Sequence, residues 1–171
     1  RIPKEKSATC AKATELLIDT YLVQLSCGQA VDLERVVALA AEMYKVHRCH
    51  DTRRMLARCL CYRLCQYLAA EDPDAKALLE RTRRNLYSLA QVALLLEKGG
   101  AIAAKTAAHP DFKRAAELIR EDAEQVPGRS AVWELAILKS ADPAAGARLE
   151  AALRASEMEL LAAEIELRFA P

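Results

Sequence analysis

The fold is decided by the stretch HRCHDTRRMLARCLCYRLCQYL, which spans His47–Leu68. Placed on a helix, this stretch is apolar on nearly every side apart from its arginines. Its polar stripe is narrow and consists mainly of Arg54, Arg58 and Gln66. A helix with so little polar surface must contact other helices around most of its circumference. We therefore predict that it is the central helix of the fold, beginning after a cap at Asp51.

The composition of the whole chain also favours helices. Hydrophobic residues make up 53% of the 171 residues and aromatic residues only 5%, so alanine and leucine supply most of the apolar surface. Both enter helices at little cost, whereas sheets favour β-branched and aromatic side chains. The sequence predicts an all-α fold of about eight helices stacked as antiparallel hairpins, in the manner of an α-solenoid or a helical bundle, with no sheet.

Capping residues divide the chain into helices. We expect residues 1–6 to form a flexible N-terminal segment and residues 7–171 to form a single all-helical domain. Asp32, Asp72 and Asp142 are predicted N-caps. The expected helices cover about residues 7–26, with Leu16, Leu17, Tyr21, Leu22 and Leu25 as the apolar face, then 32–46, 51–70, 73–98, 110–125, a short helix around Trp133 and a last helix from Pro143. Residues 101–108 form either a short helix or a loop.

The charges are unevenly distributed, although the formal net charge is only +1. Lys45–Arg84 carries ten basic and five acidic residues, whereas Asp111–Arg168 carries eight basic and twelve acidic residues. The candidate basic contact face consists of Arg53, Arg54, Arg58, Arg81, Arg83 and Arg84. It predicts a solvated face or a contact with an acidic partner, and RNA is the alternative. The acidic residues Glu117, Glu121, Asp122 and Glu124 are interpreted as a solvated helix face.

The six cysteines and two nearby histidines could suggest a metal site. Zinc needs four converging ligands, but Cys61 and Cys65 share one helix face while Cys59 points to the other side. His47 and His50 lie about 15 to 20 Å along the helix from that pair. We therefore predict buried, reduced thiols and no metal or other cofactor; a metal or redox protein is the third alternative for function.

Cys49 is the candidate reactive thiol. It lies just before a helix and between Arg48 and His50, all features that lower the pKa of a thiol. No oxyanion-hole glycine or third catalytic group can be named beside it. The chain also lacks a Gly-rich phosphate loop, a paired-carboxylate pattern and a metalloprotease motif. We therefore expect a protein that is not an enzyme.

One resemblance to a known family can be followed by position. PDFKRAAELIREDAEQVPG, residues 110–128, has an aromatic, a small, an apolar and a closing residue at Phe112, Ala115, Ile119 and Pro127. Trp133, the only tryptophan, stands where a following repeat would place its large aromatic. With RRNLYSLAQVALLLEKGG, residues 83–100, as a first helix, about residues 85–155 resemble tetratricopeptide repeats, which implies a scaffold of stacked helical hairpins. Residues 101–108 are an insertion relative to that pattern, and Leu149 replaces an expected small residue.

The end of the chain carries the clearest expectation about partners. Met158, Leu161, Ile165 and Phe169 form a second apolar stripe beside the one that would dock on the domain. Such a stripe either is buried within the domain or packs on another subunit. The sequence thus predicts a protein–protein interaction domain that acts as a subunit or adaptor, in a homo- or hetero-oligomer. The alternative is an RNA-associated organellar or ribosomal factor.

The same patterns give an expectation for the compartment. No apolar run approaches the roughly 20 residues that a membrane-spanning helix needs, and no signal-peptide core is present. Reduced thiols predict an intracellular, reducing compartment. We expect the cytoplasm, or an organellar matrix if a presequence preceding Arg1 was removed.

Overall fold

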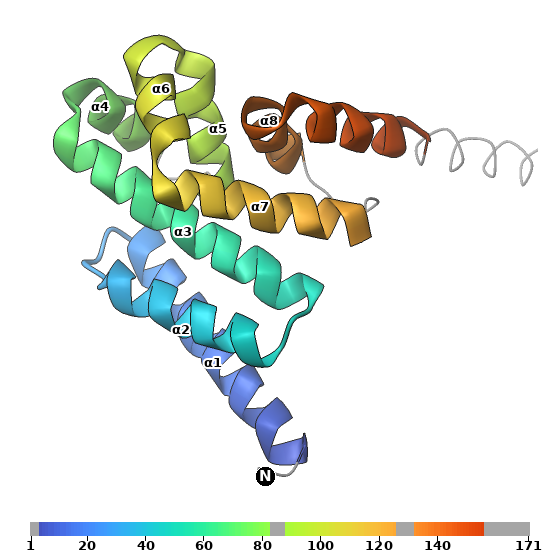
Figure 1. Ribbon diagram of the computed structural model, residues 1–171. Helices are drawn as coiled ribbons and strands as arrows, with labels where there is room; N and C mark the ends of the chain where they lie inside the picture. The colour runs from blue at the N-terminus through green and yellow to red at the C-terminus, as the bar shows by residue number, and fades with distance from the viewer. Residues whose placement is uncertain (1–3, 83–87, 126–131, 156–171) are drawn as a thin grey trace, which may run out of the picture.

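The computed structural model describes residues 4–82, 88–125 and 132–155, and within these ranges it contains helices and no strand (Figure 1). The labelled helices are α1 (Lys4–Ser26), α2 (Leu33–Val46), α3 (His50–Glu71), α4 (Pro73–Thr82), α5 (Ser88–Lys98), α6 (Gly100–Ala108), α7 (Pro110–Gln125) and α8 (Val132–Ala141). Residues 143–155 are also helical. The prediction of an all-α fold is confirmed.

Helix α3 lies at the centre of the arrangement (Figure 1). It packs against α2 on one side and α7 on the other, and it also contacts α4 and α5. Helix α1 packs on α2, while α6 and α8 each contact both α5 and α7. Most helices therefore lie beside the helix that follows them in the chain, as expected of stacked hairpins.

The burial of α3 explains its central position. Cys59, Cys61 and Leu64 are completely buried although they point in different directions around the helix. Only a few of its residues, such as Gln66 and Tyr67, are exposed. Its buried apolar residues are Met55, Leu56, Ala57, Cys59, Leu60, Cys61, Leu64, Cys65 and Leu68. The predicted role of this stretch as the central helix is confirmed.

Three of the four predicted helix caps are confirmed. The Oδ1 atoms of Asp32, Asp72 and Asp142 each accept a hydrogen bond from the backbone amide three residues later, at 3.2, 3.3 and 3.0 Å. The predicted cap of α3 is wrong, because Asp51 lies in the first turn and the N-cap residue is Cys49. Asp51 instead places a negative charge at the positive end of the helix, which is favourable there.

The single long helix predicted from Pro73 to Gly99 is wrong. Helix α4 ends at Thr82 and α5 begins at Ser88, with residues 83–87 outside the described ranges. In one continuous helix, Leu79 and Gln91 would be about 18 Å apart. Both side chains instead line the same cavity, and α4 contacts α5. The chain therefore forms two helices that pack side by side.

Two glycines separate α5 from α6. Gly99 and Gly100 have φ angles of 73° and 62°, values in the left-handed region that side chains other than glycine disfavour. The pair ends α5 as predicted, and the chain resumes at once as α6. Of the two alternatives for residues 101–108, the structure contains the short helix.

Helix α1 presents a different face to the core from the one predicted. It begins at Lys4, before the expected Ser7. Ile18 and Leu22 are buried, whereas Leu16 and Leu17 are 58% and 40% exposed. The prediction that these two leucines face the core is wrong because α1 lies at the edge of the fold and packs mainly on α2, so it can bury only one stripe.

Candidate functional site

A buried ionic cluster joins α2, α3 and α7. Arg53 is only 4% exposed, and its Nη1 donates to Oδ1 of the buried Asp122 at 3.0 Å. Nδ1 of His50 lies 2.7 Å from Asp122 Oδ2. Glu121 Oε2 accepts a hydrogen bond from the Tyr44 hydroxyl at 3.0 Å and lies 3.7 Å from Arg53 Nε. Asp122 thus lies against two basic side chains at once, those of Arg53 and His50.

A second ion pair links the C-terminal half of α3 to the first turn of α7. Arg63 donates from Nε and Nη2 to the two carboxylate oxygens of Asp111 at 2.8 and 2.6 Å, which raises the pKa of the guanidinium. Arg53 and Arg63 are about 15 Å apart along their helix, and Asp111 and Asp122 about 16.5 Å. The two spacings match in antiparallel order. This match is a sequence signal that our prediction missed.

Two more residues of the candidate basic face, Arg54 and Arg58, also lie close to acidic groups of this chain. Nη2 of Arg54 lies 2.8 Å from Oε1 of the buried Glu134, and Nη1 of Arg58 lies 3.9 Å from Asp19 Oδ1. Arg81 is exposed on α4. Arg83 and Arg84 lie outside the described residues.

These contacts correct two interpretations of the charge pattern. Arg53 does not lie on a solvated face, because it is buried against Asp122. Asp122 is likewise not part of a solvated acidic face, although Glu117 and Glu124 are exposed as expected. The basic stretch of α3 and the acidic residues of α7 and α8 therefore neutralise each other inside the molecule.

The cysteines of α3 are buried thiols. Cys59, Cys61 and Cys65 are free and buried, as predicted. Burial raises the pKa of Cys59 and of Cys65 to about 12, and it raises that of Cys61 well above its usual value. These three thiols are therefore protonated at neutral pH and serve as small apolar groups in the helix contacts.

Cys49, the candidate reactive thiol, is exposed at the start of α3. Its backbone amide donates to Thr52 Oγ1 at 3.2 Å, and its Sγ lies 3.5 Å from the same oxygen. The two expected activating neighbours have other contacts, because Nδ1 of His50 faces Asp122 and Arg48 lies over the Tyr44 ring at 5.8 Å. Its reactivity stays a prediction.

Two further features are absent from the described ranges. No group of three or more His, Cys, Asp or Glu side chains there is placed to bind a metal ion. Nor is any helix in these ranges both long enough and apolar enough to cross a membrane.

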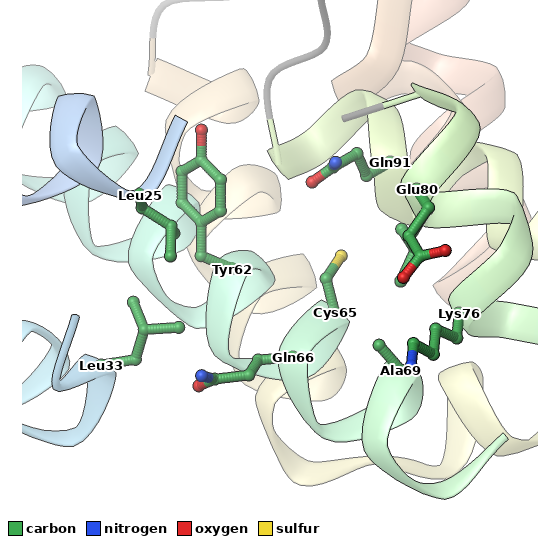
Figure 2. Close-up of a pocket in the computed structure, with 10 residues that line it drawn as sticks. Leu25, Leu33, Tyr62, Cys65, Gln66, Ala69, Lys76, Glu80 and Gln91 are labelled. Atoms are coloured by element: carbon green, nitrogen blue, oxygen red, sulfur yellow. The ribbon is translucent and has the colours of Figure 1, made fainter. Parts of the chain in front are cut away.

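A partly open cavity of about 220 Å³ lies between α1, α2, α3, α4 and α5 (Figure 2). Leu25, Leu33, Ala69 and Leu79 contribute apolar walls from four helices. Gln91 of α5 also lines the cavity and is buried. It is the only polar residue of the apolar run 89–96, and this is the signal by which the sequence could have indicated the cavity.

An apolar stripe is exposed on α1. Leu16, Leu17 and Val23 are 58%, 40% and 60% exposed. Residues 16 and 23 are two turns apart and lie on one side of the helix, and Leu17 projects about 100° further around it. The partner-binding residues predicted from the sequence, Met158, Leu161, Ile165 and Phe169, lie outside the described residues.

No family model, no curated protein and no solved structure matches this chain. The resemblance of residues 85–155 to tetratricopeptide repeats stays a prediction that rests on its own positions. The functional proposal therefore rests on the ion pairs of α3, the thiols and the exposed apolar stripe of α1.

Proposed function

We propose that this chain is a non-catalytic, protein-binding domain that serves as a subunit or adaptor of a larger assembly. The observation that carries the proposal is the exposed apolar stripe of α1. Leu16 and Val23 each leave more than half of their side chains in contact with water, next to a core that already buries Ile18 and Leu22. Covering such a stripe with the apolar face of a partner helix is favourable because it removes this surface from water.

The ion pairs of α3 favour this proposal over RNA binding. A phosphate-binding face needs accessible cations, and Arg53 is buried while Arg54 and Arg63 lie against acidic groups of this chain. Binding of Arg53 or Arg63 to phosphate would require the α3–α7 contact to open, and binding of Arg54 would require its ion pair with Glu134 of α8 to break.

The thiols support a reducing compartment as part of the proposal. The described cysteines are free, and two of them, Cys27 and Cys49, are exposed. Exposed free thiols persist where the redox poise keeps them reduced. We therefore infer an intracellular setting, the cytoplasm or an organellar matrix.

The test compares association of the wild-type chain with that of surface variants. Affinity capture from the native source, quantified by mass spectrometry, and the mass of the purified chain in solution are measured for wild type, for Leu16→Glu/Val23→Glu and for a chain truncated after Ser156. We expect the double variant to capture at least about tenfold less of the partner than the wild type does, because charges replace two interface anchors. Truncation tests the predicted role of Met158, Leu161, Ile165 and Phe169 and should also weaken association.

The matched control is Val46→Glu, which changes an apolar residue that is 67% exposed at the end of α2. It should leave association unchanged. A chain that stays monomeric and captures the same proteins in all four forms would rule out the proposal.

A further inference from the structure

The cavity of Figure 2 is lined by the largely buried side chain of Gln91. Gln91 is 6% exposed, and its side-chain amide has no hydrogen-bond partner among the described residues. Figure 2 shows this amide pointing into the cavity, with the thiol of Cys65 directed into the same space. A ligand that enters the cavity displaces water from this amide, and it loses affinity unless it replaces the hydrogen bonds of that water. An occupant that offers both a donor and an acceptor would satisfy the amide.

The charges at the edge of the cavity favour an uncharged occupant. Lys76 and Glu80 are exposed one turn apart on α4 and carry opposite charges, so they provide little net field for an ion. At the inner end, burial keeps the Cys65 thiol neutral by raising its pKa to about 12. A charged ligand would lose its hydration there without gaining a counter-charge.

The size and walls of the cavity limit the ligand further. Its volume is about 220 Å³. A cavity of roughly 150 Å³ in another protein accepts benzene, so there is room here for one ring and a short substituent. The ring of Tyr62 and the side chains of Leu25, Leu33 and Leu79 form apolar walls, which suit an aromatic ring.

We propose that this cavity is a binding site for a neutral, single-ring aromatic molecule that carries a carboxamide or hydroxyl group. The polar group of the ligand pairs with the Gln91 amide, and the ring fills the space between α1, α3 and α4. A carboxamide suits Gln91 best, because each amide donates one hydrogen bond and accepts one. The site is independent of the α1 stripe proposed above for protein binding.

The probe is benzamide, and its control is cumene, in which an isopropyl group of similar shape replaces the carboxamide. The side-chain amide signal of Gln91 is followed by NMR while each compound is added to the full chain. The backbone amide signals of Cys65 and Leu79, which also line the cavity, are followed with it and report binding in the Gln91→Leu variant as well. We expect benzamide to shift the Gln91 signal in a saturable way with a dissociation constant on the order of 1 mM, as is usual for so small a ligand. Cumene should bind about tenfold more weakly, because it leaves the amide unpaired.

Two variants assign the effect to Gln91. Gln91→Leu should weaken benzamide binding about tenfold and leave cumene binding equal or stronger. Gln29→Leu, at an exposed position outside the cavity lining, should change neither. If Gln91→Leu does not fold, the preference of the wild-type chain for benzamide over cumene decides alone. Equal binding of the two compounds, or no saturable shift of the Gln91 signal up to about 10 mM benzamide, would overturn the proposal.

Discussion

Arg53 and Asp122 form the contact on which the packing of α3 against α7 depends most. Both are almost completely removed from water, so each carries a desolvation cost that is offset mainly by the other. Glu121, at 3.7 Å from Arg53 Nε, is more exposed and compensates the charge only in part. The cost of losing one partner should therefore exceed the net contribution of the pair to stability.

Replacing Asp122 by Asn tests this asymmetry. The substitution keeps the shape but leaves the Arg53 charge buried, and we expect it to lower the free energy of unfolding by about 3 kcal/mol. The double substitution Arg53→Met/Asp122→Leu should recover most of that loss, because apolar side chains carry no desolvation cost. Urea unfolding gives the free energy of unfolding of the wild type, of Asp122→Asn and of the double variant. The control is Glu117→Gln, which removes an exposed pair with Arg114 and should cost less than about 0.5 kcal/mol. Equal losses in Asp122→Asn and the control would contradict the interpretation.

The buried thiols predict a specific loss of stability at alkaline pH. The pKa of Cys65 is about 12 in the folded chain and about 9 when the thiol is exposed. Between these values the unfolded chain has lost the proton and the folded chain has kept it. The contribution of the thiol is therefore complete below about pH 9 and falls by up to about 1.4 kcal/mol per pH unit above it.

Urea unfolding in the presence of a reductant, measured at several pH values from about 8 to 10.5, tests this dependence. The free energy of unfolding should fall less steeply with pH in Cys65→Ala than in wild type, because one thiol with a raised pKa has been removed. Cys49→Ala changes an exposed thiol and should keep the wild-type slope. If the free energy of unfolding fell with the same slope in Cys65→Ala and Cys49→Ala, the Cys65 thiol would not be the source of the pH dependence.

The helices themselves were largely predictable, because their ends are marked by local chemistry. Asp32, Asp72 and Asp142 act over three residues, and their caps can be recognised without knowledge of the rest of the chain. The same holds for the glycine pair at 99–100, whose conformation few other residues adopt. The low polarity of residues 47–68 likewise placed α3 at the centre.

What could not be predicted depends on which helix lies beside which. Leu16 and Leu17 have the hydrophobicity of core residues, and only the edge position of α1 leaves them exposed. The run from Pro73 to Gly99 is helical in character throughout, and its division into α4 and α5 follows from their packing beside each other. The prediction that Asp122 lies on a solvated face failed because it depends on the register between two helices. Only the placement of α7 against α3 brings Asp122 next to Arg53 and buries it.

Inside the described ranges, the contacts of α3 with α2, α4, α5 and α7 connect the N-terminal and C-terminal helices through a single element. The buried residues form one continuous apolar cluster that runs from Ile18 in α1 to Leu149. A chain organised around one shared helix cannot unfold at one end while the other end keeps its core, since either loss exposes a face of α3. We therefore expect residues 7–171 to unfold as one cooperative unit.

Trp133 allows that expectation to be tested, because it is the only tryptophan and lies in α8, far along the chain from α1. In urea, its fluorescence reports the C-terminal helices, whereas far-ultraviolet circular dichroism reports all helices together. One cooperative unit predicts that the two transitions superimpose, with the same midpoint and the same slope. Leu64→Ala, which empties a completely buried position of α3, should shift both midpoints equally while lowering the free energy of unfolding by about 2 to 5 kcal/mol. A fluorescence transition that separates from the circular dichroism transition, or that does not move in Leu64→Ala, would mean that the C-terminal helices form a unit of their own and that α3 does not couple the two ends.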